Sequence, residues 1–333
     1  MPTPAPAATP PALMQRLTQA FTPLAPVAAP PASGSAAQLT AAVTTQAAAQ
    51  QQSAAPLLQS LAVRLTHLPP AVAEAAARLL SSRINLDRGA PSAAALKQAV
   101  LQSGVFLDAP AKAGTPADTR QALQGLRSAL LGWLGGEVEP VPPADRRPPP
   151  PARGDVPRAQ MPEVPPPATE GSAKEAGKTL LSQTEGALSR IKLMQLTSQP
   201  PDTSRLGTPL PGPSEWNLEL PLILGRELTM AQIQINRDGK GKAEAKEKHW
   251  RLRFALKFSV LGEVGAQVSM LGSKTSVALW ADETLTADAL EDMLPELAPA
   301  FAARGLELVS LSVRRGAPRD EARPAGRLMD SLR

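Results

Sequence analysis

The sequence predicts an α+β domain at the C-terminal end of the chain, built from an antiparallel sheet and one packed, kinked helix. A small all-α module and long disordered segments rich in proline and alanine precede it. Three observations support this fold class. The 333 residues include 37 prolines, no tyrosine and 3% aromatic residues, a composition typical of chains of which large parts stay unfolded. Apolar residues recur at helical spacing in the middle of the chain, and they alternate with polar residues after residue 216.

The first part of the chain changes character near Pro56. Residues 1–55 are rich in Pro, Ala, Gln, Ser and Thr and are predicted to be disordered. A small helical module is predicted at 56–136, where periodic runs are separated by Pro-Pro and Gly-Thr-Pro. Ser92 and Asp118 stand at the N-cap positions of two of its helices. The first of these helices carries an apolar stripe of Leu96, Val100 and Leu101.

The stretch GSAKEAGKT at 171–179 ends in the Gly-Lys-Thr of a phosphate-binding loop. Its spacing is wrong, because five residues instead of four separate Gly171 from Gly177, and prolines instead of a buried strand precede it. Lys178 and Thr179 are therefore predicted to be ordinary residues of a helix.

That helix is amphipathic, covers residues 173–199, and stands between a proline-rich linker at 137–172 and a second linker at 200–215. No other helix or strand is predicted in the linkers on either side of it, so it is predicted to be an isolated helix. It either docks on a neighbour or waits for a partner, and the sequence favours neither alternative.

A folded domain is predicted at 216–316. The run WRLRFALKFSV at 250–260 alternates without a miss, which predicts a strand with Trp250, Phe254 and Phe258 on a buried face. Strands before and after it, joined by a turn at Leu261-Gly262 and a hairpin at 272–274, complete an antiparallel meander.

A helix and a last strand are predicted to close this domain. Thr286 is a suitable N-cap for the helix. Pro295 and Pro299 remove backbone donors, so a kink or break is expected near Met293. The apolar residues Leu290, Met293, Leu294, Leu297 and Phe301 are expected to face the sheet. The last strand should point Val309, Leu311 and Val313 inward, and residues 317–333 are predicted to form a basic flexible tail.

Catalytic and metal chemistry find little support in the sequence. There is no cysteine, and the two histidines, His67 and His249, are far apart in the chain. The carboxylate pair Glu291 and Asp292 is better explained by solubility than by acid–base catalysis. No catalytic residue, cofactor site or metal site is therefore predicted, and the protein is not expected to be an enzyme.

A basic strip of the central strand is the candidate contact for a partner. Arg251, Arg253 and Lys257 alternate with the apolar residues, so they share the wet face and could meet an acidic partner. The formal net charge of +5 also leaves open a scaffold or nucleic-acid-associated protein that uses the basic linker and tail, although nucleic acid is not the expected partner.

The C-terminal residues resemble a known family. The order LELPLILGRELTMAQIQI, then WRLRFALKFSVLGEVGAQVSMLGSKTSVALWADE, then LEDMLPELAPAFAARGLELVSLSV is similar to the C-terminal domain of flagellar hook-length control proteins. The resemblance covers roughly residues 216–316, and upstream LKQAVLQSGVFLD resembles the helical segment of longer family members.

This resemblance implies a non-enzymatic regulator of flagellar type III export. Family members are made in the cytoplasm, are exported through the growing hook without a cleavable signal peptide, and sense hook length with the N-terminal part. Their C-terminal domain contacts the cytoplasmic domain of the export-gate membrane protein and switches export from hook-type to filament-type substrates; hook or hook-cap subunits are further partners. Residues 1–215 pulled straight would span about 700 Å.

Overall fold

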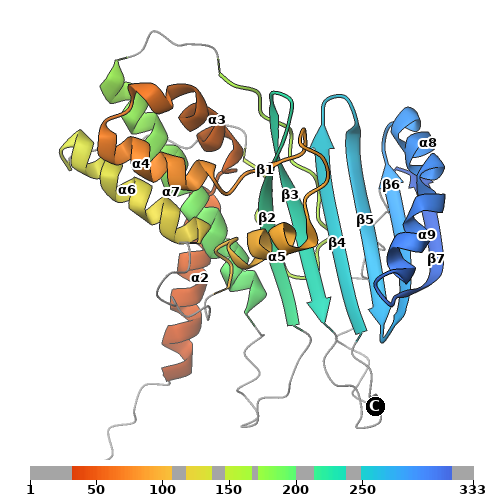
Figure 1. The fold of residues 1–333 in the computed structure, drawn as a ribbon. Helices are drawn as coiled ribbons and strands as arrows, with labels where there is room; N and C mark the ends of the chain where they lie inside the picture. The colour runs from red at the N-terminus through yellow and green to blue at the C-terminus, as the bar shows by residue number, and fades with distance from the viewer. Residues whose placement is uncertain are drawn as a thin grey trace, which may run out of the picture. The chain divides into compact units, whose positions relative to one another are not determined.

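The computed structural model describes residues 32–106, 118–136, 147–166, 172–199, 214–237 and 249–316 (Figure 1). The chain divides into two units, Met1–Val43 and Thr44–Arg333. Helix α2 (Ala32–Gln50) starts in the first unit, inside the segment predicted to be disordered, because alanine and glutamine favour helix. The stretch near Leu13 lies outside the described residues. The second unit is α+β, as predicted.

The described residues of the second unit form one sheet of seven strands in the order of the sequence. They are β1 (Ile84–Asn85), β2 (Ser214–Leu224), β3 (Glu227–Arg237), β4 (His249–Phe258), β5 (Gly262–Leu271), β6 (Lys274–Ala281) and β7 (Glu307–Arg315). Strands β2 to β6 form the predicted antiparallel meander, whereas β1 runs parallel to β2 and β7 runs parallel to β6. The parallel strand β7 follows from a helical crossover between β6 and β7.

The ladder pairing defines two faces of the sheet, because residues directly opposite each other point the same way. The face called apolar here carries Trp216, Leu218, Leu220, Leu222, Ile233, Ile235, Trp250, Leu252, Phe254, Leu256, Phe258, Val264, Ala266, Val268, Met270, Val277, Leu279, Leu311 and Val313. The other face is called polar; its residues on β2 and β3 include Glu215, Glu219, Leu228, Met230, Gln232 and Gln234. The predicted alternation of β4 is confirmed, but Val260 lies beyond the strand and is exposed.

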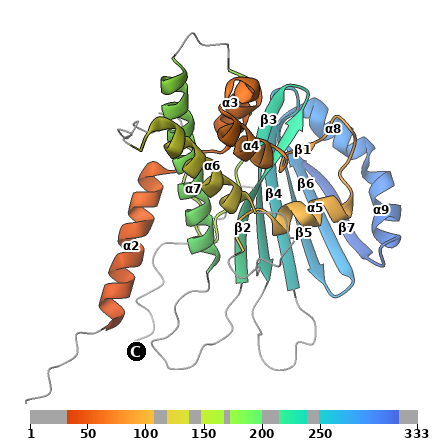
Figure 2. The ribbon, with the colours of Figure 1, turned by 60° about the vertical axis from the view of Figure 1, so that its left-hand side comes forward.

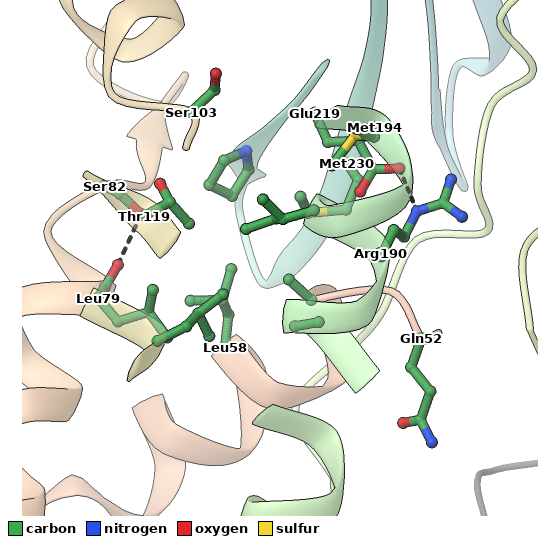
Figure 3. Close-up of a pocket in the computed structure, with 15 residues that line it drawn as sticks. Gln52, Leu58, Leu79, Ser82, Ser103, Thr119, Arg190, Met194, Glu219 and Met230 are labelled. Atoms are coloured by element: carbon green, nitrogen blue, oxygen red, sulfur yellow. Dashed lines mark hydrogen bonds and ion pairs between the residues drawn. The ribbon is translucent and has the colours of Figure 1, made fainter. Parts of the chain in front are cut away.

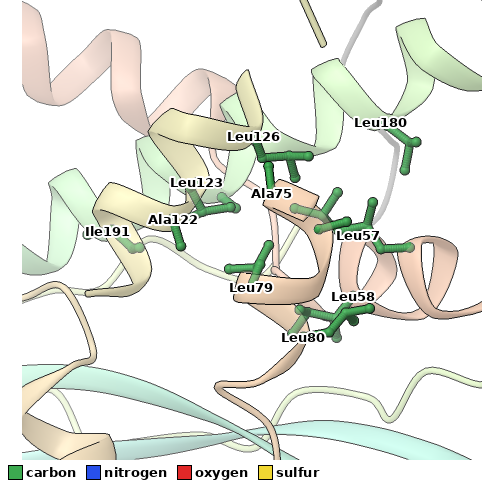
Figure 4. Packing of buried hydrophobic residues seen from close by; sticks show 14 of the residues in the cluster. Leu57, Leu58, Ala75, Leu79, Leu80, Ala122, Leu123, Leu126, Leu180 and Ile191 are labelled. Carbon is green, nitrogen blue, oxygen red and sulfur yellow. The ribbon is translucent and has the colours of Figure 1, made fainter. Parts of the chain in front are cut away.

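Four helices share one core with the first long strands. They are α3 (Ala55–Arg64), α4 (Pro70–Leu80), α6 (Thr119–Leu134) and α7 (Ala173–Ser198). Their leucines interdigitate (Figure 4). Leu228 and Met230, from the polar face of β3, belong to the same cluster. Both ribbon views show these helices on the β2 side of the sheet (Figure 2). The helix predicted to be isolated, α7, therefore docks on neighbours within its own chain.

The Gly-Lys-Thr run lies inside α7. Ser172 caps the helix, accepting a hydrogen bond from the Glu175 backbone N–H, and the Glu175 carboxylate accepts one from Ser172 in return. A Cβ at Gly177 would stand 2.7 Å from the Trp133 ring, so this glycine permits α6 and α7 to approach closely. The prediction that Lys178 and Thr179 are ordinary helix residues is confirmed, and the Thr179 hydroxyl donates to the Glu175 carbonyl oxygen.

An extended segment, residues 147–166, lies against the polar face in the region predicted to be linker. The Gly154 N–H donates to Glu215 at 2.9 Å, and the Gln234 side chain donates to the Asp155 carbonyl oxygen at 2.8 Å. Further along, Glu163 forms a two-way backbone bridge with Leu228. Proline has no N–H to pair, and sheet side chains bind the backbone groups of Gly154 and Asp155 between the prolines.

The C-terminal helix is broken where prolines predict a break. Helix α8 (Thr284–Asp292) ends before Met293, and α9 (Leu294–Ala302) begins after it. The N-cap prediction is wrong: Thr286 lies within α8, and its hydroxyl donates to the Leu261 carbonyl oxygen. In β7, Leu311 and Val313 are half-buried, but Val309 falls at a bulge and is exposed.

Candidate docking surface

The three cations predicted to contact a partner lie together on the polar face of β4. Arg251, Arg253 and Lys257 are each half-buried. The Arg253 Nε donates to the Gln267 side chain at 2.8 Å. The 147–166 segment passes this strand, since its Asp155 bonds to β3 and its Ala159 N–H lies 3.5 Å from the Glu263 carboxylate of β5. Their role in partner binding stays a prediction.

The opposite, apolar face is buried at Leu218, Leu220 and Leu222 of β2, but over β4 and β5 it is less covered than its composition predicts. On β4, Phe258 is buried, while Trp250, Leu252, Phe254 and Leu256 are half-buried. On β5 the small Ala266 is buried, while the larger apolar side chains of this face, Val264, Val268 and Met270, are half-buried. Strands in the middle of a seven-stranded sheet therefore keep much of their apolar side accessible to a partner.

Two tryptophans and an arginine gather at one end of this face. The Trp216 and Trp250 rings stack with centroids 6.3 Å apart, and the Arg237 guanidinium lies 5.7 and 5.6 Å from the two ring centroids. All three side chains are half-buried. Tryptophan and arginine dominate the binding energy of protein interfaces, and the stacking holds these rings in place before any partner arrives.

The helices that flank the apolar face are themselves poorly covered. Helix α5 (Ala93–Leu101) packs against β2 but has no buried residue, and Leu96 and Leu101 of its predicted apolar stripe are exposed. On the other flank α8 and α9 pack against β7, and Ala287 is the buried residue of the pair. Leu285 is 85% exposed and Met293 55%. The five residues predicted to face the sheet are thus only partly covered or, at Met293, exposed.

The α8–α9 flank is acidic. From residue 282 to residue 303 the chain has no lysine or arginine. Its acidic residues are Asp282, Glu283, Asp288, Glu291, Asp292 and Glu296. Asp288 pairs with Arg315 at 2.9 Å, whereas Glu291, Asp292 and Glu296 are exposed. A half-covered apolar face bordered by negative charge is suited to a partner that is both apolar and basic.

The interior between helices and sheet holds a buried ion pair. Arg190 Nε lies 2.5 Å from Glu219 Oε1, and the side chains are 5% and 4% exposed. The Gln51 side chain accepts a hydrogen bond from Arg190, and the Gln160 side chain donates one to Glu219. The adjoining cavity measures about 30 Å³ (Figure 3). It has room for about one or two water molecules, which is too small for a substrate or cofactor, and the ion pair beside it joins α7 to β2.

No reactive arrangement occurs among the described residues. Glu291 and Asp292 are exposed at the end of α8. In the described part of the chain, no group of three or more His, Asp or Glu side chains is placed to hold a metal ion. None of the described helices is long and apolar enough to cross a bilayer.

Sequence reasoning found the apolar face but read it as buried core. The alternation of apolar and polar residues shows which residues share a face of the sheet. It does not show what covers that face. The available signal was the broken helix, whose prolines and acidic residues interrupt the apolar stripe that a tightly packed helix needs.

The comparisons with known proteins assign the C-terminal part of the chain. No curated protein and no solved structure matches the chain. Residues 238–322, which contain β4 to β7 with α8 and α9, match the family model described as flagellar hook-length control protein FliK. The predicted resemblance is confirmed for this region. The match supports a role in flagellar hook-length control, which is a regulatory and non-enzymatic kind of function, and the C-terminal region is similar to the family of flagellar hook-length control proteins.

Proposed function

We propose that this chain is an exported flagellar regulator that senses hook length and switches type III export from hook-type to filament-type substrates. In this proposal the C-terminal domain performs the switch by docking on the cytoplasmic domain of the export-gate membrane protein. The observation that carries the proposal is the family match at residues 238–322. The half-exposed apolar face of β4 and β5, which lies within the matched region, supports docking as the mode of action.

The N-terminal part acts as the length sensor in this proposal. Export through a narrow channel requires the polypeptide to unfold, so α3, α4, α6 and α7 would be pulled apart before they contribute to a measured length. A leucine-packed core without disulfides suits this step, since it resists extension less than a cross-linked one.

A gene deletion tests the proposal. Cells that lack the gene should assemble overlong hooks without filaments, and the full-length gene should restore both hook length and filaments. Hook lengths are measured by electron microscopy of isolated hook–basal bodies. Filaments on hooks of normal length in the deletion strain would contradict the proposed function.

Direct docking requires a second measurement. The purified full-length chain should bind the purified cytoplasmic domain of the export-gate protein, measured by isothermal titration calorimetry. Burial of apolar surface in the complex should give a negative heat-capacity change. Absence of binding together with overlong hooks in the deletion strain would retain the regulatory role and exclude this partner.

A further inference from the structure

We propose that the apolar face between α5 and α8–α9 receives one amphipathic helix from a partner protein, with basic residues turned toward α8–α9. The inference rests on the proposed function, because it names the chemistry of the partner segment that the C-terminal domain would take.

The space on the sheet corresponds to one helix. Helix α5 packs against β2, and α8 packs against β6 and β7. Four strand spacings separate β2 from β6, or about 19 Å. Packed helices stand 8 to 10 Å apart, so this width leaves room for roughly one more helix beside α8, whereas α5 crosses the strands instead of running along them (Figures 1 and 2).

The side chains beneath that position are apolar, and apart from the buried Ala266 they are half-buried. Trp250, Leu252 and Phe254 on β4 lie across from Met270, Val268 and Ala266 on β5. On the flanks, Leu96 and Leu101 of α5 and Leu285 and Met293 of α8–α9 are exposed. A helix that lies on β4 and β5 would contact the sheet and both flanks, which explains why neither flanking helix has more than one buried residue.

Charge complementarity selects a basic helix. Exposed carboxylates at Glu291, Asp292 and Glu296 border the face on one side. On the other side α5 carries Lys97, and Arg237 lies against the two tryptophan rings at one end of the face. A second copy of this chain would bring its own acidic flank to the interface, which costs free energy through like-charge repulsion. An amphipathic helix that carries lysine or arginine would bury its apolar side on the sheet and place its positive charges near the acidic flank.

The probes are two synthetic peptides of about 18 residues, roughly 27 Å long as helices, with leucine on one face. The other face carries lysine in one peptide and glutamate in the second. Fluorescence anisotropy measures their binding to the full-length chain at low salt. The lysine peptide should bind at least about tenfold more tightly than the glutamate peptide.

Matched variants locate the site. Met270 and Ser276 are both half-buried on neighbouring strands but point to opposite faces. Met270→Lys should weaken the lysine peptide about tenfold, whereas Ser276→Lys should leave binding within about twofold. Thermal unfolding checks that both variants fold. If Met270→Lys does not, Leu285→Lys replaces it, because that side chain is 85% exposed.

Neutralising the acidic flank tests the charge argument. The variant Glu291→Gln/Asp292→Asn/Glu296→Gln should reduce binding of the lysine peptide about fivefold and leave the glutamate peptide no weaker than before. The exposed acid Glu74, which lies in the helical part on α4, provides the control Glu74→Gln.

Several outcomes overturn the inference. Equal binding of both peptides, or equal loss in Met270→Lys and Ser276→Lys, excludes this face as a basic-helix site. A dimer in sedimentation that Met270→Lys dissociates identifies a second copy as the occupant. Tighter peptide binding after removal of residues 317–333 identifies the chain's own tail. Normal hooks in the deletion strain, together with the predicted peptide binding, contradict the proposed function but not this site. Overlong hooks without peptide binding contradict this site but not the proposed function.

Discussion

The Arg190–Glu219 pair should be essential for stability, and replacing either partner alone should be far more damaging than replacing both. Arg190→Met leaves the Glu219 carboxylate, which is 4% exposed, without its cation. Removing one partner of a buried pair costs about 3–5 kcal/mol, because the remaining charge stays desolvated. With a urea m-value of about 3 kcal/mol/M, the unfolding midpoint should fall by roughly 1 to 1.7 M. The double variant Arg190→Met/Glu219→Leu should recover at least half of this loss.

The exposed pair Glu74–Arg78 is the matched control. Its side chains are 68% and 66% exposed, so Arg78→Met should change the free energy of unfolding by less than about 1 kcal/mol. Tryptophan fluorescence and far-ultraviolet circular dichroism should report the same midpoint in urea, since Arg190 on α7 and Glu219 on β2 belong to one core. An Arg190→Met midpoint as high as that of Arg78→Met, or separate transitions for helices and sheet, would refute the reasoning.

Three further predictions concern the helical part and the charge of the chain. Gly177→Ala should destabilise the protein by about 1–3 kcal/mol in thermal unfolding, because its Cβ meets Trp133, whereas Gly132→Ala, with open space at that point, should be neutral or stabilising. Ser172→Ala should cost about 1 kcal/mol through loss of the capping box at Glu175, and unchanged stability in urea would contradict that role. The full-length chain should not retard DNA in gels at low salt; retardation that weakens steeply with salt would favour the nucleic-acid alternative.

The sequence predicts local structure where one physical rule dominates. Alternation in 250–260 fixes the face of every residue of β4, and the hairpin at 272–274 follows from Gly272, which has φ +59°. The break at Met293 follows from Pro295, which is tolerated in the first turn of α9 and not in the interior of one long helix. Ser92 and Asp118 cap α5 and α6 as predicted, since each side chain accepts a backbone N–H three residues on.

The sequence does not predict how the helices meet the sheet. Glu215 lies in the segment predicted to be a linker, and Glu219 and Gln234 are polar residues of predicted strands, yet all three are buried beneath helices or the 147–166 segment. Their burial depends on partners far away in the chain, such as Arg190 for Glu219 and Asp155 for Gln234. Polar alternation cannot distinguish a solvated face from one that is covered and fully hydrogen-bonded, because the residue types are the same. The domain boundaries at 136, 172 and 215 therefore stay predictions drawn from composition.

The contrast between a covered polar face and a half-covered apolar face bears on function. The chain covers the polar face of β2 and β3 with its own helices, where buried carboxylates and amides find specific partners, and it leaves the apolar face of β4 and β5 half-covered. Specific polar contacts make the first interface internal and permanent, since each unpaired buried group would cost free energy. An apolar surface has no polar groups that need hydrogen-bond partners, so it can stay half-exposed until a partner binds. The region that matches the hook-length control family carries this second kind of surface, so binding there can change without disturbing the helical core.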